Sequence, residues 1–477
     1  MAAIHEVPSI TFHEQSSRDQ LFDNIKEAEE RLAAQRCLAQ IPKPKIQRVP
    51  ITLRDHENFV KYYEPRAVAL GPFHHGNQKC ELAEKFKFAL AATYINESGC
   101  QAEDLLKIIE VNINMLRDCY DEESTKSYND EALAQLFFLD GCSTLQFIYS
   151  LMHGELANFK IKRDQVAFAE QDLFLLENQL PYQVLKLLMS LSKKQGQLKS
   201  TIEDFVQKNI IAAKKKKSKG HKHTTPCHLK STHQSGDTAI DVKNTEAEPT
   251  HLLELLRTKM LGPQKSNGKK KKVKDRQQSF RNIQELKAAG IHLKPSKECS
   301  LRDISFTSLG FAGFLSLPPI SVDDSMRPKF LNLIAYEMCP DFENDFGISS
   351  YIGFLDSLID HADDVKELRS AGVLYNFLGS DEEVAKLFNE IGTDLVPNSD
   401  IYRTVKAKME KHYKNKCKTW MAQFCHEHFS SPWTILAFIG VLAALGLSGI
   451  QTWYTIVSPP SPCDSVCQYL KEQLNIK

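Results

Sequence analysis

The chain has 477 residues, of which 42% are hydrophobic and 25% charged, which allows two or three ordinary globular domains with a substantial core. Its 60 basic residues balance 60 acidic ones, so the net charge does not point to nucleic acid or an anionic surface as a partner. The 12 cysteines are scattered without repeated CxxC pairs, which favours reduced thiols over a disulfide framework or a zinc module.

The first expected element is an amphipathic helix over residues 19–40, within an N-terminal lead-in that ends at 45. Apolar residues recur there at helical spacing among charged ones, and Pro42 and Pro44 end the pattern. We expect this helix to dock on the body or on a partner. No signal peptide is expected, because residues 1–20 hold several charged side chains and no apolar run.

Residues 46–208 are expected to form the helical N-terminal part of the body. Proline and glycine are dense from 46 to 76, which predicts an ordered but irregular segment. Helical periodicity then predicts three helices, over residues 79–94, 105–120 and 132–151. Residues 163–189 add two helices that separate at 178–181, because a proline favours a boundary just before it.

A lysine-rich insertion follows at residues 209–282. Its lysine tracts at 214–217 and 269–272 lie among Gly, Ser, Thr and His, and blocks of like charge rarely pack, so we expect a disordered loop. A short amphipathic helix over 249–261 interrupts it. The tracts leave three alternatives open: a solvated loop without a ligand, a patch for anionic lipid, and a nuclear-import or nucleic-acid-binding signal. Nucleic acid is not the expected partner.

Residues 283–429 are expected to combine a few strands with further helices. Shorter apolar periods at 291–293, 301–307 and 314–322 predict a small antiparallel β meander. Helical patterns return over 327–389. A last amphipathic helix over 401–429 leads almost directly into the next segment, with residues 430–432 as a hinge.

A run without any charged residue or histidine extends from Trp433 to Val457. A helix of this length covers more than the roughly 30 Å hydrocarbon core of a bilayer, so we expect a transmembrane helix. The alternative, a buried core helix, is usually shorter and carries a polar stripe. Trp433, Trp453 and Tyr454 lie near the ends of the run, where aromatic rings favour the headgroup region.

Small residues recur within this run at Gly440, Ala444 and Ser448, spaced four apart on one helix face. Such a ridge lets two membrane helices approach closely, which would allow a homodimer through this face. The alternative is that glycine and alanine are simply common in membrane helices.

Positive charge around the run predicts its orientation. Lysines are more frequent just before it than after it: Lys411, Lys414, Lys416 and Lys418 against Lys471 and Lys477. The positive-inside rule therefore places the N-terminal body in the cytosol. The tail, residues 458–477, would face the lumen or exterior, where Cys463 and Cys467 form a disulfide or stay as free or intermolecular thiols. Asn96, in the only Asn-X-Ser/Thr sequon of the chain, should then stay unmodified.

Few residues are candidates for catalysis. His74 and His75 could hold a metal or serve as acid and base with Glu177, and Cys142 could be a nucleophile. The structural alternatives are hydrogen bonds that tie the segment around the histidines to the helices, and a small buried thiol. The sequence holds no Walker loop, GxGxxG or GxSxG elbow, so we predict no catalytic residue, cofactor or metal.

A polar cluster, Glu177, Asn178 and Gln179, lies between leucines. Polar groups that are buried need hydrogen-bond partners. We therefore expect a structural network at a helix junction, with a ligand pocket as the alternative.

Four segments resemble the plant family called domain of unknown function 247, in the order that the family has them: 49–76, 140–142, 175–182 and 332–337. The motif residues are Val49, Pro50, Gly71, Pro72, His74, His75, Gly76, Glu177, Asn178, Gln179, Pro181, Asn332 and Glu337. The resemblance implies a C-terminal membrane helix and no established biochemical activity. Some grass members are implicated in pollen-side self-incompatibility, a role that motif likeness alone does not transfer.

These observations predict a mainly α fold with a small antiparallel β meander, a lysine-rich disordered insertion and one C-terminal transmembrane helix. The expected function is that of a tail-anchored plant membrane protein whose cytosolic body binds other proteins in recognition or signalling. Its expected partners are the lipid bilayer, an unidentified protein and a second copy of the chain. Two alternatives stay open: a membrane-tethered enzyme using His74, His75, Glu177 or Cys142, and a nuclear or nucleic-acid-binding protein.

Overall fold

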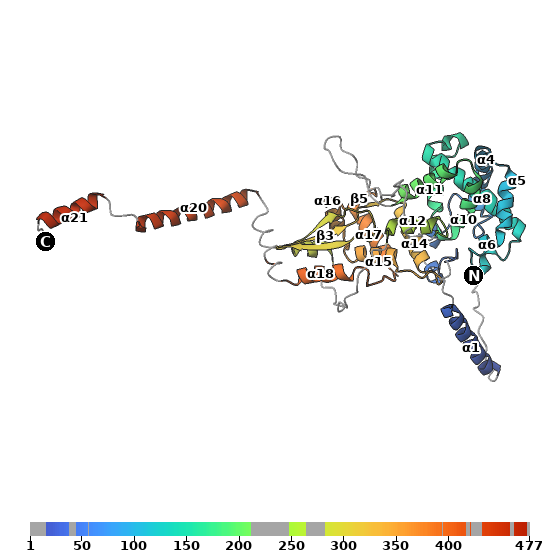
Figure 1. The fold of residues 1–477 in the computed structure, drawn as a ribbon, viewed down its shortest axis with the longest axis horizontal. Coiled ribbons are helices and arrows are strands. Elements are labelled where there is room, and N and C mark those ends of the chain that lie inside the picture. The colour runs from blue at the N-terminus through green and yellow to red at the C-terminus, as the bar shows by residue number, and fades with distance from the viewer. Residues whose placement is uncertain are drawn as a thin grey trace, which may run out of the picture.

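The computed structural model describes residues 16–37, 44–55, 57–210, 248–263, 282–393, 395–415, 420, 432–457 and 462–474. As predicted, the fold is mainly helical with small sheets. Figure 1 shows a compact body from which α20 (Pro432–Val457) and α21 (Pro462–Leu474) extend at one end. Both lysine tracts lie outside the described residues, as does most of the sequence from 416 to 431.

The central element of the N-terminal half is α8 (Asp130–His153). It begins where the side chain of Asn129 accepts a hydrogen bond from the Ala132 N–H, and it ends at Gly154, which has a φ of 76°. Most side chains from Leu133 to Ser150 are buried. A helix that is buried on nearly all sides needs neighbours on every side, and α4, α5, α10 and α11 pack around it.

Six other helices build this half: α4 (Glu81–Ser98), α5 (Ala102–Val111), α6 (Ile113–Arg117), α9 (Arg163–Asp172), α10 (Tyr182–Leu191) and α11 (Gln195–Asn209). Short helices and 3-10 turns connect them: α2 (Ile51–Arg54), α3 (Phe59–Tyr63), η1 (Gln78–Cys80), α7 (Glu122–Thr125), η2 (Leu156–Phe159) and η3 (Leu176–Asn178). The predicted helices at 79–94 and 132–151 and the pair at 163–189 are confirmed.

Two details of this half differ from the prediction. The helix expected over 105–120 is divided at Asn112, whose side-chain amide donates to the carbonyl of Ile108 at 2.7 Å. Such local bonds compete with the regular helical pattern. Helix α11 was not predicted, although Leu198, Ile202 and Phe205 have helical spacing and are buried.

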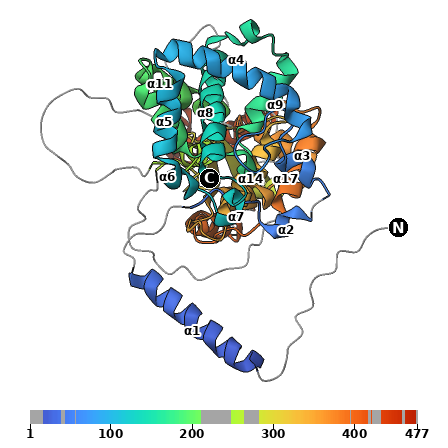
Figure 2. The ribbon, with the colours of Figure 1, turned by 90° about the vertical axis from the view of Figure 1, so that its right-hand side faces the viewer.

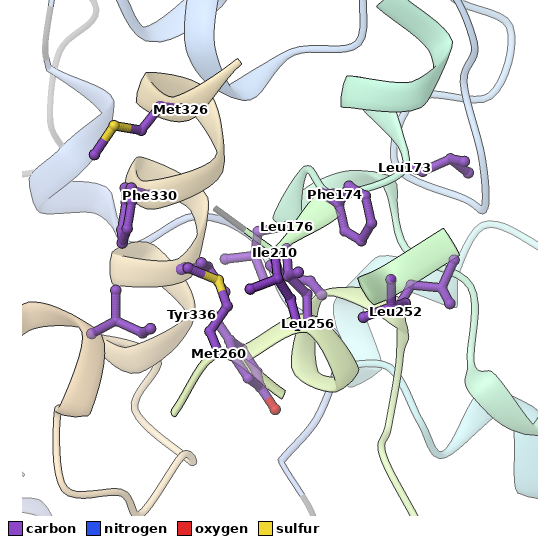
Figure 3. Close-up of a cluster of buried hydrophobic side chains, with 14 of the residues drawn as sticks. Leu173, Phe174, Leu176, Ile210, Leu252, Leu256, Met260, Met326, Phe330 and Tyr336 are labelled. Carbon is purple, nitrogen blue, oxygen red and sulfur yellow. The ribbon is translucent and has the colours of Figure 1, made fainter. Parts of the chain in front are cut away.

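The C-terminal half begins with α12 (Leu252–Leu261), the helix predicted within the insertion. Within the described residues it continues with α13 (Ile283–Ala288), α14 (Met326–Glu337), α15 (Gly347–Asp356), α16 (Ala362–Ser370), α17 (Asp381–Gly392) and α18 (Arg403–Tyr413). Figure 3 shows how the halves meet: Phe174 and Leu176 face Leu256 and Met260 of α12, and α14 contributes Tyr336. One continuous hydrophobic core therefore joins the two halves.

The strands form a mixed sheet and not the predicted antiparallel meander. The order is β1 (Ile291–Pro295), β3 (Ala312–Leu317), β2 (Ser305–Leu309), in which β1 and β3 are parallel and β2 and β3 antiparallel. A second pair, β4 (Ile320–Val322) and β5 (Leu374–Asn376), is parallel. Burial explains this order. Strand β3 is more apolar than β2 and more buried, and it lies at the centre of the sheet. Strand β2 is rich in Ser and Thr, is mostly exposed and lies at an edge.

Helix α1 (Ser16–Cys37) stands away from the body (Figure 2), and its side chains at Leu21 and Ile25 are more than half exposed. The predicted docking of this helix on the body is therefore not seen, and docking on a partner stays a prediction. Of the long helix expected over 401–429, the structure describes α18 up to Tyr413.

Candidate functional site

The irregular segment 44–77 is held against the helices by side chains that come from distant parts of the chain. Asp172 at the end of α9 is the clearest case: its buried carboxylate accepts the N–H groups of Arg66, Ala67 and Val68 at 2.7 to 3.1 Å. Burial raises the pKa of Asp172 to about 6, although the three N–H donors act against this. One carboxylate thus fixes three successive peptide groups.

The polar cluster at Glu177, Asn178 and Gln179 extends this network. Asn178 accepts the Leu70 N–H at 2.7 Å and donates to the carbonyl of Val68 at 2.9 Å. Gln179 donates to two carbonyls of its own turn and accepts the Leu253 N–H of α12 at 3.0 Å. These three side chains are buried and hydrogen-bonded to backbone, so they form a structural network at a helix junction.

A buried ion pair lies beneath the Gly71 turn. Asp140 of α8 accepts the Gly71 N–H at 2.8 Å and pairs with Lys87 of α4 at 2.7 Å. Lys87 also binds the carbonyl of Ala69 at 2.6 Å and the carboxylate of Glu84 at 2.8 Å, which occupies all three of its N–H donors. Burial by itself lowers the pKa of Lys87, but the carboxylates of Asp140 and Glu84 together outweigh burial and the pKa is raised.

Backbone geometry explains the glycine and proline positions of the first motif. Gly71 has a φ of 67°, and a Cβ there would lie 2.8 Å from the Tyr120 hydroxyl, so a larger residue is excluded. The carbonyl of Pro72 accepts the Tyr128 hydroxyl at 3.4 Å, and Gly76 has a φ of 78°. Other prolines stand just before helices: Pro50 before α2 and Pro181 before α10.

The last motif connects the halves. Asn332 of α14 accepts the Leu176 N–H at 2.8 Å and donates to the carbonyl of Tyr62 at 2.9 Å. Glu337, at the end of α14, accepts the N–H groups of Ile348 and Ser349 at the start of α15. It also accepts from Arg257 of α12 at 2.8 Å. A carboxylate at a helix N-terminus is favoured by the unpaired N–H groups there.

Two of the four candidate catalytic residues are brought together. His74 Nε2 lies 3.7 Å from a carboxylate oxygen of Glu177, whose other oxygen accepts the Val49 N–H and an Arg54 N–H. Burial lowers the pKa of His74 to about 4, so its imidazole is neutral at pH 7 and forms no ion pair. His75, by contrast, is exposed, with its ring 6.2 Å from that of Tyr128.

Cys142 is fully buried in α8, and burial raises the pKa of its thiol. A nucleophilic cysteine needs a lowered pKa, so this environment is the reverse of an activating one. Across the ranges that the structure describes, no three His, Cys, Asp or Glu side chains gather to hold a metal ion.

A cleft of about 160 Å³ lies beside the network, between α4, α8 and α9. Its lining is mostly apolar, with the basic residues Arg66, Lys79 and Lys87 and no carboxylate. The guanidinium of Arg66 stacks 3.9 Å above the ring centre of Phe168. An apolar cavity of about this size accepts a molecule no larger than a benzene ring with small substituents.

The candidate membrane helix is α20. The span Trp433–Val457 has 25 residues, a mean hydropathy of 2.1 and no residue buried against the rest of the protein. Gly440, Ala444 and Ser448 share one face of it by helical spacing, and a Cβ at Gly440 would meet no atom within 4 Å. The rings of Trp433, Trp453 and Tyr454 are exposed near its two ends.

The sequence analysis did not identify three charged residues that make many of the buried hydrogen bonds and ion pairs of this network. Lys87, Asp172 and Arg257 gave no signal as buried groups, because charged residues on amphipathic helices usually face solvent. The hint that was present is Gly71 itself, since a turn that requires glycine indicates a close approach of another group.

Comparisons with known proteins agree with this picture. The family model of DUF247, described as a plant protein of unknown function, matches residues 46–447. The UPF0481 protein At3g47200 of Arabidopsis thaliana is 27% identical over 428 residues, which covers 84% of this chain and 85% of that protein. The putative UPF0481 protein At3g02645 of the same plant is 26% identical over 179 residues, or 37% of this chain and 33% of that protein. No solved structure matches the chain.

Proposed function

The chain belongs to the DUF247 family of plant proteins of unknown function, and we propose that it is a single-pass, tail-anchored membrane protein whose cytosolic body binds another protein in recognition or signalling. The observation that carries this proposal is α20. A helix of 25 residues with a mean hydropathy of 2.1 has no protein core to bury it here. Exposed to water, so many apolar side chains would be unfavourable, whereas a bilayer accommodates them.

Lysine distribution supports the orientation. Lys411 and Lys414 are exposed at the end of α18, ahead of α20, and α21 carries Lys471 as its one basic residue. The positive-inside rule then keeps the body on the cytosolic side.

The buried network supports binding as the function of the body. The motif side chains use their hydrogen bonds on backbone groups, and the pKa of His74, lowered to about 4 by burial, makes its imidazole a weak base. Burial raises the pKa of the Cys142 thiol, which keeps it protonated and therefore a poor nucleophile. Such a network gives the body a rigid surface. A rigid surface on a membrane-bound body suits recognition of a partner.

Carbonate extraction of membranes tests the anchor. We expect the full-length protein to stay in the membrane pellet. The double variant Leu442→Lys with Leu445→Lys should be released, because each central lysine costs about 2.5 to 3.5 kcal/mol of insertion free energy. The matched control is Val466→Lys with Leu470→Lys, which puts the same charges on the exposed surface of α21 and should stay in the pellet. Release of the unaltered protein would overturn the anchor.

Proximity labelling in plant cells tests the binding role. A labelling enzyme is fused to the full chain, to a chain truncated after Phe429, and to residues 430–477 alone. We expect a set of neighbours that only the full chain labels, because both the body and its placement are needed. If the anchor alone labels the same set, the body contributes no recognition and this part of the proposal is wrong.

A further inference from the structure

Two large apolar side chains lie exposed at the tip of the β2–β3 hairpin. Leu309 is 76% exposed and Phe311 is 55% exposed, on either side of Gly310. Gly310 has a φ of 58° and is the first residue of a two-residue turn, a position where a tight hairpin favours glycine. The turn therefore has regular hairpin geometry, and this geometry holds the two apolar side chains in exposed positions.

The hairpin stands where the chain leaves the body for the anchor. Ser308, next to Leu309, has its hydroxyl oxygen 3.1 Å from Nδ1 of His412, and the His412 ring packs edge-on against Phe306 at 5.7 Å. His412 lies in the last turn of α18, the last body helix ahead of α20 whose bounds the structure describes. Figure 1 shows the hairpin projecting from the end of the body that faces α20.

Exposed basic side chains lie on α18, the helix that contacts β2 through His412. Lys408, Lys411 and Lys414 are exposed on α18, and the one acidic residue of that helix, Glu410, is buried and paired with Lys414 at 2.7 Å. Exposed apolar residues next to a helix with exposed lysines match the chemistry of a cytosolic leaflet, where anionic headgroups lie above an apolar interior.

We infer that the β2–β3 tip inserts into the headgroup region of the same bilayer that α20 crosses, with the α18 lysines on anionic phospholipid. This inference rests on the proposed membrane anchorage. A single span does not by itself fix which face of the body points away from the membrane, whereas a second contact does. The α5 end, opposite the hairpin in Figure 1, is then directed into the cytosol.

Photo-crosslinking of the full-length protein in nanodiscs tests the contact. A diazirine amino acid is placed at Leu309, at Val111 of α5, or at Leu442 of α20, and lipid adducts are measured by mass spectrometry. Val111 is the matched control, because it is also 76% exposed but belongs to α5, which lies at the other end of the body in Figure 1. In discs of phosphatidylcholine with phosphatidylserine, we expect adducts at 309 and 442, and several-fold fewer at 111.

The outcomes separate the two proposals. Adducts at 442 with no more at 309 than at 111 would overturn the hairpin contact and leave the anchor intact. Absence of adducts at 442 would overturn the anchor itself.

The lysines have a separate test. The double variant Lys408→Gln with Lys411→Gln should lower the adduct yield at 309 several-fold, as should replacing phosphatidylserine by phosphatidylcholine. Lys107→Gln, at an exposed lysine of α5, is the control and should leave the adduct yield at 309 unchanged. An adduct yield at 309 that ignores both changes would exclude anionic lipid as the partner of these lysines.

Discussion

The Lys87–Asp140 pair shows at the scale of single residues how much the buried network contributes. Removing one member of a buried ion pair leaves the other charge without compensation, which costs about 3 to 5 kcal/mol. We expect Lys87→Met to lower the free energy of unfolding by about that amount, measured by chemical denaturation of the full-length protein. Lys79→Met is the control, because the Lys79–Glu64 pair is largely exposed and should contribute about 0 to 1 kcal/mol.

A second variant distinguishes the effect of the unpaired charge from the effect of lost side-chain packing. Adding Asp140→Asn to Lys87→Met removes the stranded charge and keeps an oxygen for the Gly71 N–H. We expect part of the lost stability to return. If the double variant is no more stable than Lys87→Met alone, charge is not the reason for the loss.

His74 provides a pH-dependent prediction. Its pKa is about 4 in the folded protein and about 6.5 when unfolded, so the unfolded state binds the proton first. The corresponding stability is present above pH 6.5 and is lost as the pH falls to 4, by up to about 3 kcal/mol. Asp172, whose pKa is raised to about 6, acts in the opposite direction in part of this window. The comparison must therefore be made between variants.

The measurement is the difference in unfolding free energy between the unaltered protein and His74→Gln from pH 7 to pH 4. We expect the unfolding free energy of the unaltered protein to fall steadily below pH 6.5 relative to that of His74→Gln. His75→Gln, at the exposed neighbour, serves as the control. A difference that stays constant over this range would mean that the imidazole is not buried in its neutral form.

Single residues also show what the sequence could reveal about the site. Three polar residues among leucines indicate buried groups with partners, and Glu177, Asn178 and Gln179 are such groups. Their partners could not be named, because Val49, Leu70 and Leu253 are brought to them only by the tertiary fold.

At the scale of elements, periodicity located most helices because each buries one face against α8 or the common core. It failed where local pattern does not decide the outcome. Alternating residues indicate strands, but the choice of β3 as the central strand depends on which strand can be covered on both faces. The division at Asn112 depends on one side-chain bond that competes with the helix.

Helix α20 allows a prediction about self-association. If two copies pack through the Gly440, Ala444 and Ser448 ridge, Gly440→Leu should weaken dimerisation, because the leucine side chain prevents close approach. Gly446→Leu is a matched control, since it adds the same bulk at the same kind of residue on roughly the opposite face of the helix. A Cβ at either glycine meets nothing within 4 Å, so neither variant strains the helix.

Dimerisation is measured by crosslinking or by energy transfer between labelled copies in vesicles. We expect loss with Gly440→Leu and retention with Gly446→Leu. Equal effects of the two variants, or no dimer in the unaltered protein, would refute packing through this ridge.

At the scale of the whole molecule, the two ends of the body differ. One end carries the β2–β3 hairpin and the exit towards α20, and the other carries α5. The membrane attachment that we propose at the first end would leave the second end for a partner. This division could not be derived from the sequence, because only the tertiary fold brings His412 of α18 against Ser308 and Phe306 of β2.

The orientation across the membrane provides the final prediction. Asn96 is exposed in the last turn of α4 and belongs to the sequon Asn96-Glu97-Ser98, so the sugar-transferring enzyme would meet it if the body entered the lumen. We expect Asn96 to remain unmodified when the full chain is inserted into microsomes. A short extension with a new sequon after Lys477 should instead be glycosylated, because the proposed topology translocates the tail. Glycosylation is measured as a shift in gel mobility that glycosidase treatment reverses. The variant Asn96→Gln is the control for modification at Asn96. Sugar on Asn96 together with an unmodified extension would place the body in the lumen and reverse the topology, while leaving α20 as the span.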